Sequence, residues 1–210
     1  MITNYENIVK QSEIKELLDF TFINDNYYDE SPTNVRKEVA LNATDWPVVT
    51  INKIISRLNL DHELEYVFFW HHKTTNFGLH ADCGDGNHKL LGKNIIIPLD
   101  FDKDTPTTTV IFKNKWHGSA VNFYKGGHHP YEDSSKCEGY DINKNIDEKI
   151  YQKYLKHIDR KTLKGLEIQK IYNWKLGDVF TFDRQHIHSP GYNYAPKTSM
   201  IIFTNRKGYQ

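Results

Sequence analysis

Six short runs rich in β-branched and aromatic residues occupy much of the chain after residue 63, and they limit its fold more than any other feature. Gly, Asn and Asp separate these runs, as turn residues separate neighbouring strands. Several strands at such spacing are typical of a β-sandwich or a β-barrel. The runs are residues 64–72, 91–99, 107–113, 167–174, 178–184 and 198–205.

Two helical patterns come before these runs. Apolar residues recur at helical spacing within residues 6–20 and again within residues 45–59, where Pro47 suits a first helical turn. Each pattern leaves one apolar face, which a helix buries against another layer. Residues 1–60 are therefore predicted to be a mostly helical support on one side of a sheet.

The segment from about residue 113 to residue 166 differs from its surroundings. Its first half has turn residues and little periodicity, whereas residues 145–165 have an apolar helical face and end at Gly165, a residue type that commonly terminates helices. This segment is predicted to be an insertion with one helix. At 210 residues the chain is long enough for one well-filled core, so residues 1–210 are predicted to form a single domain.

The overall charge is balanced. The chain has 27 Lys and Arg residues and 27 Asp and Glu residues, so it has no net field that would hold nucleic acid or an acidic membrane surface. No apolar run is long enough to cross a bilayer, and the first residues do not resemble a signal peptide, so a cytoplasmic protein is expected. Cys83 and Cys137 are too few for a disulfide framework and are predicted to be reduced thiols, with Cys83 a bystander.

A histidine and an aspartate stand two positions apart in the sequence GLHADCGDG, residues 78–86. In an extended strand, side chains at positions i and i+2 point to the same face, so His80 and Asp82 can meet at one point. An imidazole and a carboxylate suit a divalent metal such as iron(II), and a second histidine completes a facial triad with open coordination positions. A pair with this spacing also occurs by chance as an ordinary loop hydrogen bond, so a distant partner is needed.

The sequence LGDVFTFDRQHIHSPGYNYAPKTSMIIF supplies such a partner. A turn at Gly177 and Asp178 starts a predicted strand, and His188 stands at the far end of that strand. A basic residue, Lys197, follows nine residues later, and Ser199 opens the next apolar strand. The chain thus combines His-x-Asp, a long interval, a second histidine, a basic residue and a serine.

This order of residues resembles the iron(II)- and 2-oxoglutarate-dependent dioxygenases, including prolyl-hydroxylase-like members and uncharacterised bacterial and phage members. The resemblance covers residues 64–206 and extends to the setting of the motif: an apolar strand before HAD, IIIPLD and TTTVIF in the middle, and GDVFTFD before the distal histidine. It implies a mainly β fold with flanking helices, the double-stranded β-helix, a cupin-like jelly roll with the metal inside the barrel mouth.

The resemblance also implies roles for individual residues. His80, Asp82 and His188 would bind the metal. Lys197 would pair with the distal carboxylate of 2-oxoglutarate, and Ser199 would hydrogen-bond to the same group. A buried dicarboxylate needs a fixed cation and a hydroxyl donor to offset its lost hydration. Many relatives have Arg at the position of Lys197, and lysine offers a point charge in place of a bidentate fork.

Other residues compete for these roles. His186 is on the same predicted strand face as His188, although the spacing from the Gly-Asp turn favours His188 as the ligand. Arg206 is an alternative to Lys197 as the cation. Asn94, near the start of NIIIPLD, is a weaker candidate for contact with the cosubstrate.

The roles of several more histidines stay open at this point. His71 and His72 follow Trp70 on the strand that leads into the site, so either of them can line the pocket, pack in the core or be exposed. Four further histidines lie in polar loops and are expected to be solvated. They are His88, His117, His128 and His129.

The predicted function follows from the resemblance. Iron(II), 2-oxoglutarate and oxygen would serve as cofactor and cosubstrates, with succinate and carbon dioxide as coproducts. The reaction would hydroxylate an unactivated C–H of a small molecule, an amino acid or a peptidyl residue, because Asp82 supplies the carboxylate that related halogenases lack. Desaturation and cyclisation are alternative outcomes. The sequence leaves the substrate and the oligomeric state open.

Two other classes of protein fit the same residues. A cupin-like metal enzyme would work without 2-oxoglutarate, but it has no need for the buried dicarboxylate anchor of Lys197 and Ser199. A noncatalytic jelly roll would bind carbohydrate or a protein through its loops, with structural histidines. Binding of iron(II) together with 2-oxoglutarate separates these alternatives.

Overall fold

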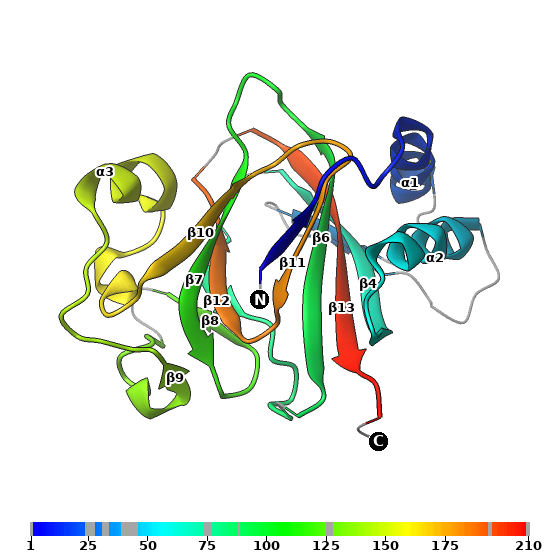
Figure 1. Cartoon of the computed structure of the whole chain (residues 1–210). Helices are drawn as coiled ribbons and strands as arrows, with labels where there is room; N and C mark the ends of the chain where they lie inside the picture. The colour runs from blue at the N-terminus through cyan, green and yellow to red at the C-terminus, as the bar shows by residue number, and fades with distance from the viewer. Residues whose placement is uncertain are drawn as a thin grey trace.

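Two antiparallel sheets curl towards one another, and helices cover their outer faces (Figure 1). The structure is a computed structural model that describes residues 2–23, 28–30, 34–38, 46–73, 77–87, 89–124, 128–192 and 195–208. The mainly β fold with flanking helices that the sequence predicts is confirmed, and the arrangement is that of a jelly roll.

The larger sheet contains seven strands. They are β1 (Thr3–Tyr5), β2 (Tyr28–Glu30), β3 (Asn34–Glu38), β4 (His62–His72), β6 (Leu91–Phe101), β11 (Val179–Asp183) and β13 (Lys197–Arg206). Their order across the sheet is β1-β11-β6-β13-β4-β3-β2. The long strands β6, β13 and β4 form the centre of this sheet, and each coincides with one of the apolar runs of the sequence.

The smaller sheet holds shorter strands. They are β5 (Leu79–Ala81), β7 (Thr108–Trp116), β8 (Val121–Phe123), β9 (Cys137–Glu138), β10 (Ile168–Asn173) and β12 (His186–Pro190). The order is β10-β7-β12-β5-β8, with β9 paired to β7. The prediction that His188 ends the strand after Gly177 is wrong, because the chain turns after β11 and places His188 in β12 of the other sheet.

Helices α1 (Gln11–Ile23) and α2 (Trp46–Leu58) cover the outer face of the larger sheet. Their apolar sides pack against side chains that alternate along the strands. In β4, Val67 and Phe69 face the helices, whereas Phe68 and Trp70 face the interior between the sheets. The first sixty residues also supply β1, β2 and β3.

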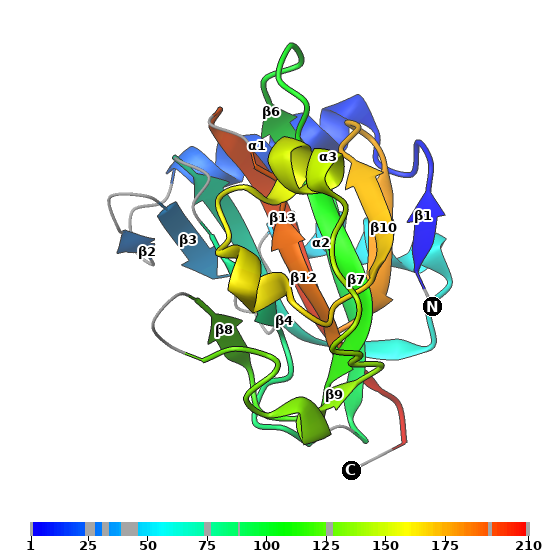
Figure 2. The same ribbon diagram turned by 90° about the vertical axis from the view of Figure 1, so that its left-hand side faces the viewer.

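The segment predicted as an insertion covers the outer face of the smaller sheet (Figure 2). It contains β8 and β9 as well as helix α3 (Glu148–Ile150), which continues as a π-helical turn at Tyr151–Leu155. The helix is shorter than predicted, because the Asp159 side chain accepts a hydrogen bond from the Lys161 backbone and starts a separate turn. 3₁₀ turns lie at Ser134–Lys136 and Arg160–Leu163. Among the described helices, none is long and apolar enough to span a membrane.

Candidate metal centre

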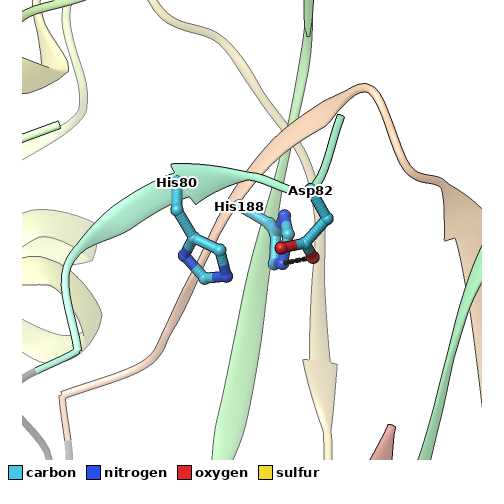
Figure 3. A group of neighbouring side chains, drawn as sticks. All are labelled: His80, Asp82 and His188. Carbon is cyan, nitrogen blue, oxygen red and sulfur yellow. Dashed lines mark ion pairs between the residues drawn. The ribbon is translucent and has the colours of Figure 1, made fainter. Parts of the chain in front are cut away.

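Two paired strands bring the predicted site residues together. His80 in β5 and His188 in β12 are direct partners across the antiparallel pair, so their side chains point to the same face. Asp82 follows β5 and turns its carboxylate to the same point (Figure 3). Each of the three residues offers one ligand atom, and these atoms all lie within 4.8 Å of one another. This cluster has the size and the donor types of a site for a single metal ion.

Backbone carbonyls fix the tautomers of both imidazoles. Nδ1 of His80 lies 3.0 Å from the oxygen of Gly78, and Nδ1 of His188 lies 2.9 Å from the oxygen of His186. A carbonyl oxygen only accepts, so both Nδ1 atoms carry a proton and donate it. The other nitrogen of His188, Nε2, faces Asp82 and lies 3.3 Å from Oδ2. Nε2 is therefore the His188 atom that could bind a metal ion together with the Asp82 carboxylate.

The surroundings favour the protonation states that bind metals. Burial, followed by the nearby His188, lowers the pKa of His80 to about 4, so this imidazole is neutral at neutral pH. Burial raises the pKa of Asp82, but contact with His188 and the charges around it outweigh burial, so the pKa lies below its usual range. A neutral imidazole and an ionised carboxylate are the forms that coordinate divalent ions.

Two further residues hold Asp82 in place. Nδ2 of Asn94 donates to Oδ2 of Asp82 at 2.7 Å. The buried Arg184 donates from Nε to the backbone oxygen of Asp82 at 2.9 Å, forms an ion pair with Glu65 and lies over the ring of Phe203, 4.6 Å from its centroid. The sequence gives no sign of this role for Arg184, because an arginine directly after an apolar strand is typical of an exposed turn.

A cavity extends from the triad along β13. Its volume is about 480 Å³ when the space that is open to solvent is included. Lys197 and Ser199 both line this cavity, and both are buried. Most of the remaining wall is aromatic or apolar. Its larger members are Phe68, Trp70, Phe77, Trp174, Ile201 and Phe203.

Lys197 is the most unusual charge in this cavity. The residue is 1% exposed, and its Nζ has no hydrogen-bond partner among the residues that the structure describes. The ring of Trp174 lies 5.4 Å from Nζ. Burial lowers the pKa of Lys197 from 10.5 to about 8, so the side chain is charged at neutral pH. A shift of this size corresponds to roughly 3 kcal/mol of unfavourable burial, which an anionic ligand would offset.

His186, the rival metal ligand, and Arg206, the rival cation, lie outside the triad and its cavity, whereas Asn94 lines the cavity. The register shifts between His186 and His188, so the two side chains take different directions. Nδ1 of His186 donates to the oxygen of Phe112 at 2.8 Å, and Nε2 lies 3.9 Å from Asp183. Arg206 is exposed at the end of β13 and does not line the cavity. The structure thus brings His188 to the triad and Lys197 to the cavity.

The adjacent histidines of β4 have different environments. His71 points away from the cavity, and its Nδ1 lies 2.9 Å from Oγ1 of Thr198. His72 lines the cavity, is 5% exposed and stacks on Trp70. Of the two candidates that the sequence left open, His72 is therefore the one that faces the site.

The loop histidines were predicted to be solvated, and one of them is not. His117 is exposed and pairs with a glutamate, and His128 is partly exposed. The prediction is wrong for His129, which is 7% exposed and has Nδ1 3.0 Å from Oγ1 of Thr162. The turn at Arg160–Leu163 covers His129. The local sequence of a loop does not reveal such a contact. His88 lies outside the described residues.

Both cysteines are free thiols, as predicted. Cys83 is buried, and its Sγ donates to the backbone oxygen of Trp116 at 3.3 Å. Burial, followed by the charge of Asp82, raises the pKa of Cys83 to about 12. This group therefore stays protonated and does not compete as a metal ligand.

Comparison with known proteins gives the fold a context. No family model and no curated protein matches the chain. Solved structures do match. HygX from Streptomyces hygroscopicus, solved with nickel, 2-oxoglutarate and hygromycin B bound, is 11% identical with a TM-score of 0.54, over 100% of this chain and 83% of HygX. A 2OG-Fe(II) oxygenase-family oxidoreductase from Burkholderia pseudomallei is 8% identical with a TM-score of 0.50, over 98% of this chain and 84% of that chain.

The chain has the fold of the 2OG-Fe(II) oxygenases. At 8–11% identity this likeness shows the fold and assigns no role to individual site residues.

Proposed function

We propose that the protein is an iron(II)- and 2-oxoglutarate-dependent oxygenase that hydroxylates an unactivated C–H. One observation carries this proposal: a single cavity joins the triad of His80, Asp82 and His188 to the buried ammonium of Lys197. A ligand that spans this cavity needs a metal-binding group at one end and a negative charge at the other. The keto acid and the distal carboxylate of 2-oxoglutarate meet both requirements, and the HygX structure holds 2-oxoglutarate within the same fold.

The donor set fits iron(II). Two imidazole nitrogens and one carboxylate oxygen suit a first-row divalent metal and leave three positions of an octahedron open. When bound, iron(II) and 2-oxoglutarate supply the oxygen-dependent oxidation of a C–H bond, with release of succinate and carbon dioxide. The carboxylate of Asp82 favours hydroxylation over halogenation, because halide transfer would need the coordination position that this carboxylate would occupy on a bound metal.

The residues of the chain supply placement. Asn94 holds the carboxylate of Asp82 so that its oxygens face the histidines. Lys197 and Ser199 would bind the distal carboxylate through charge and a hydroxyl group. The aromatic wall, with Trp174 at the Lys197 end, excludes water and strengthens these electrostatic contacts.

The substrate would bind on the other side of the triad. A second hollow borders His80 and Asp82, and residues Ala120, Val121 and Asn122 form part of its wall. β8 belongs to the segment that the sequence predicts as an insertion, so we propose that this segment influences which small molecule, amino acid or peptidyl residue is bound. Arg36 lines the same hollow.

Loss of the carboxylate tests the proposed function. Asp82→Ala is expected to lower iron-dependent formation of succinate from 2-oxoglutarate at least about 100-fold, because a metal ligand is lost. Asp85→Ala, which changes an exposed acid in the same loop, is the matched control and is expected to keep parent turnover. Circular dichroism establishes that both variants fold. Parent-level succinate formation by Asp82→Ala would contradict the proposal.

The alternative classes lack a comparable observation. A cupin-like metal enzyme without 2-oxoglutarate and a noncatalytic jelly roll both leave the buried ammonium of Lys197 without a function. Metal-dependent turnover that needs no 2-oxoglutarate would favour the first of these. Failure to bind iron(II) would favour the second.

A further inference from the structure

Three buried nitrogen atoms on neighbouring strands have no hydrogen-bond partner in the described part of the chain. They are Nζ of Lys197, Nδ1 of His72 and Nε1 of Trp70. All three side chains line the same cavity. Because buried polar groups in folded proteins are nearly always hydrogen-bonded, three such groups in one cavity indicate a ligand that completes them.

The pairing of β4 with β13 brings these groups to one face of the sheet. Lys197 lies directly opposite His72, and Ser199 lies directly opposite Trp70. Directly opposite residues of an antiparallel pair point to the same face, with Cβ atoms about 4.5–5.5 Å apart. The imidazole therefore stands beside the ammonium, and the indole stands beside the hydroxyl group.

Packing fixes the orientation of the His72 ring. Its centroid lies 4.9 Å from that of Trp70 with an interplanar angle of 11°, which is a stacked pair. Phe77 packs edge-on against Trp70 at 4.7 Å. Burial, followed by the charge of Lys197, holds the pKa of His72 well below its usual value. At neutral pH the ring is therefore neutral, keeps one N–H donor and adds no like charge beside Lys197.

We propose that His72 is a further 2-oxoglutarate-binding residue, whose Nδ1–H donates to the distal carboxylate held by Lys197. This inference rests on the proposed function. A carboxylate offers about four lone-pair sites, so the ammonium of Lys197 and the hydroxyl group of Ser199 leave room for another donor. The stack on Trp70 fixes the orientation of the imidazole ring.

Three variants separate binding from packing. His72→Phe keeps a ring on Trp70 but removes both nitrogens. His72→Asn removes the ring but keeps a donor near the position of Nδ1. His71→Phe is the matched control, because His71 is the next residue of β4, points away from the cavity and contacts Thr198 instead.

The experiment is a titration of 2-oxoglutarate and of pyruvate into each iron(II)-loaded variant without oxygen, followed by the visible charge-transfer band. Pyruvate has the keto acid but lacks the distal carboxylate. His72→Phe is expected to weaken 2-oxoglutarate binding about tenfold, the loss for one hydrogen bond to a charged group, and to leave pyruvate binding within about twofold. His72→Asn is expected to retain binding within about threefold, and His71→Phe is expected to match the parent.

The outcomes are distinct. Parent-like 2-oxoglutarate binding by His72→Phe, or an equal loss for pyruvate, overturns the role of His72 and leaves the proposed function in place. A tenfold loss in His72→Asn as well, with pyruvate unchanged, assigns the effect to the ring and also overturns it. If the iron-loaded parent binds no 2-oxoglutarate, the proposed function and the role of His72 both fall.

Discussion

The two ends of the cavity satisfy their polar groups in different ways. At the metal end, His80 and His188 donate Nδ1–H to backbone carbonyls, and Asn94 donates to Asp82. At the other end, Nζ of Lys197 has no hydrogen-bond partner within the described residues. The protein therefore fixes the direction of the metal ligands in advance, whereas the far end becomes complete only when an anion binds.

This difference has a thermodynamic consequence. A buried lysine whose pKa falls from 10.5 to about 8 destabilises the folded state by roughly 3 kcal/mol at neutral pH. A residue that costs stability in the free protein and recovers it with a ligand is typical of a binding site. The variants below test whether the two ends behave as differently as their contacts indicate.

The largest effect is expected from Lys197→Met. Removal of the buried charge is expected to weaken 2-oxoglutarate binding by at least about 100-fold and to raise the free energy of unfolding of the metal-free protein by about 2–3 kcal/mol. Calorimetric titration and urea denaturation measure the two quantities. A variant that is less stable than the parent and binds 2-oxoglutarate equally well would refute the assignment of Lys197.

A smaller effect is expected from Arg184→Gln at the metal end. Arg184 holds the backbone of Asp82, so its loss is expected to lower affinity for the metal about 10–100-fold. Arg57→Gln is the control, because Arg57 forms an ion pair with Glu13 away from the cavity. Cobalt(II) is the metal used in the titration. The Arg57→Gln variant is expected to lose stability but to keep the parent's affinity for cobalt(II). Equal losses of cobalt affinity in both variants would show that Arg184 acts only through general stability.

The pH dependence of 2-oxoglutarate binding gives a still smaller, graded effect. The side chain of Lys197 is charged below its pKa of about 8 and loses its proton above it. Affinity is therefore expected to be level below pH 8 and to fall about tenfold for each pH unit above it. In Lys197→Arg the guanidinium stays charged, so the decline is expected to vanish. If the parent's affinity for 2-oxoglutarate stays constant up to pH 9.5, deprotonation of Lys197 does not control binding.

The smallest effect on the metal is expected from His186→Gln. The His186 imidazole bonds the backbone of Phe112 and lies outside the triad, so cobalt affinity is expected to stay within about twofold of the parent. The free energy of unfolding is expected to fall by about 1 kcal/mol through loss of that hydrogen bond. A tenfold loss of cobalt affinity would instead make His186 part of the metal centre.

The long strands could be predicted from the sequence, but the short ones that carry the site could not. β4, β6 and β13 are 10 or 11 residues long and rich in β-branched and aromatic residues, so local pattern alone reveals them. β5 has three residues, and it is a strand because His80 pairs with His188 across the sheet. Pairing of this kind depends on the tertiary fold.

The contacts that hold the site also depend on the fold. The motif placed Asp82 near two histidines, but nothing in the local sequence shows that Arg184, 102 positions away, binds its backbone. The side of β4 that His72 faces follows from strand alternation, whereas its stack on Trp70 and its place opposite Lys197 follow from sheet register. Spacing can thus identify ligand candidates, and register decides what surrounds them.

X-ray absorption of the iron(II)-loaded protein tests the central claim most directly. The account predicts about two imidazole nitrogens per iron in the parent and about one in His188→Ala, because His80 and His188 both offer Nε2 to the same point. Iron without imidazole ligands in the parent, or an unchanged imidazole count in His188→Ala, would contradict it.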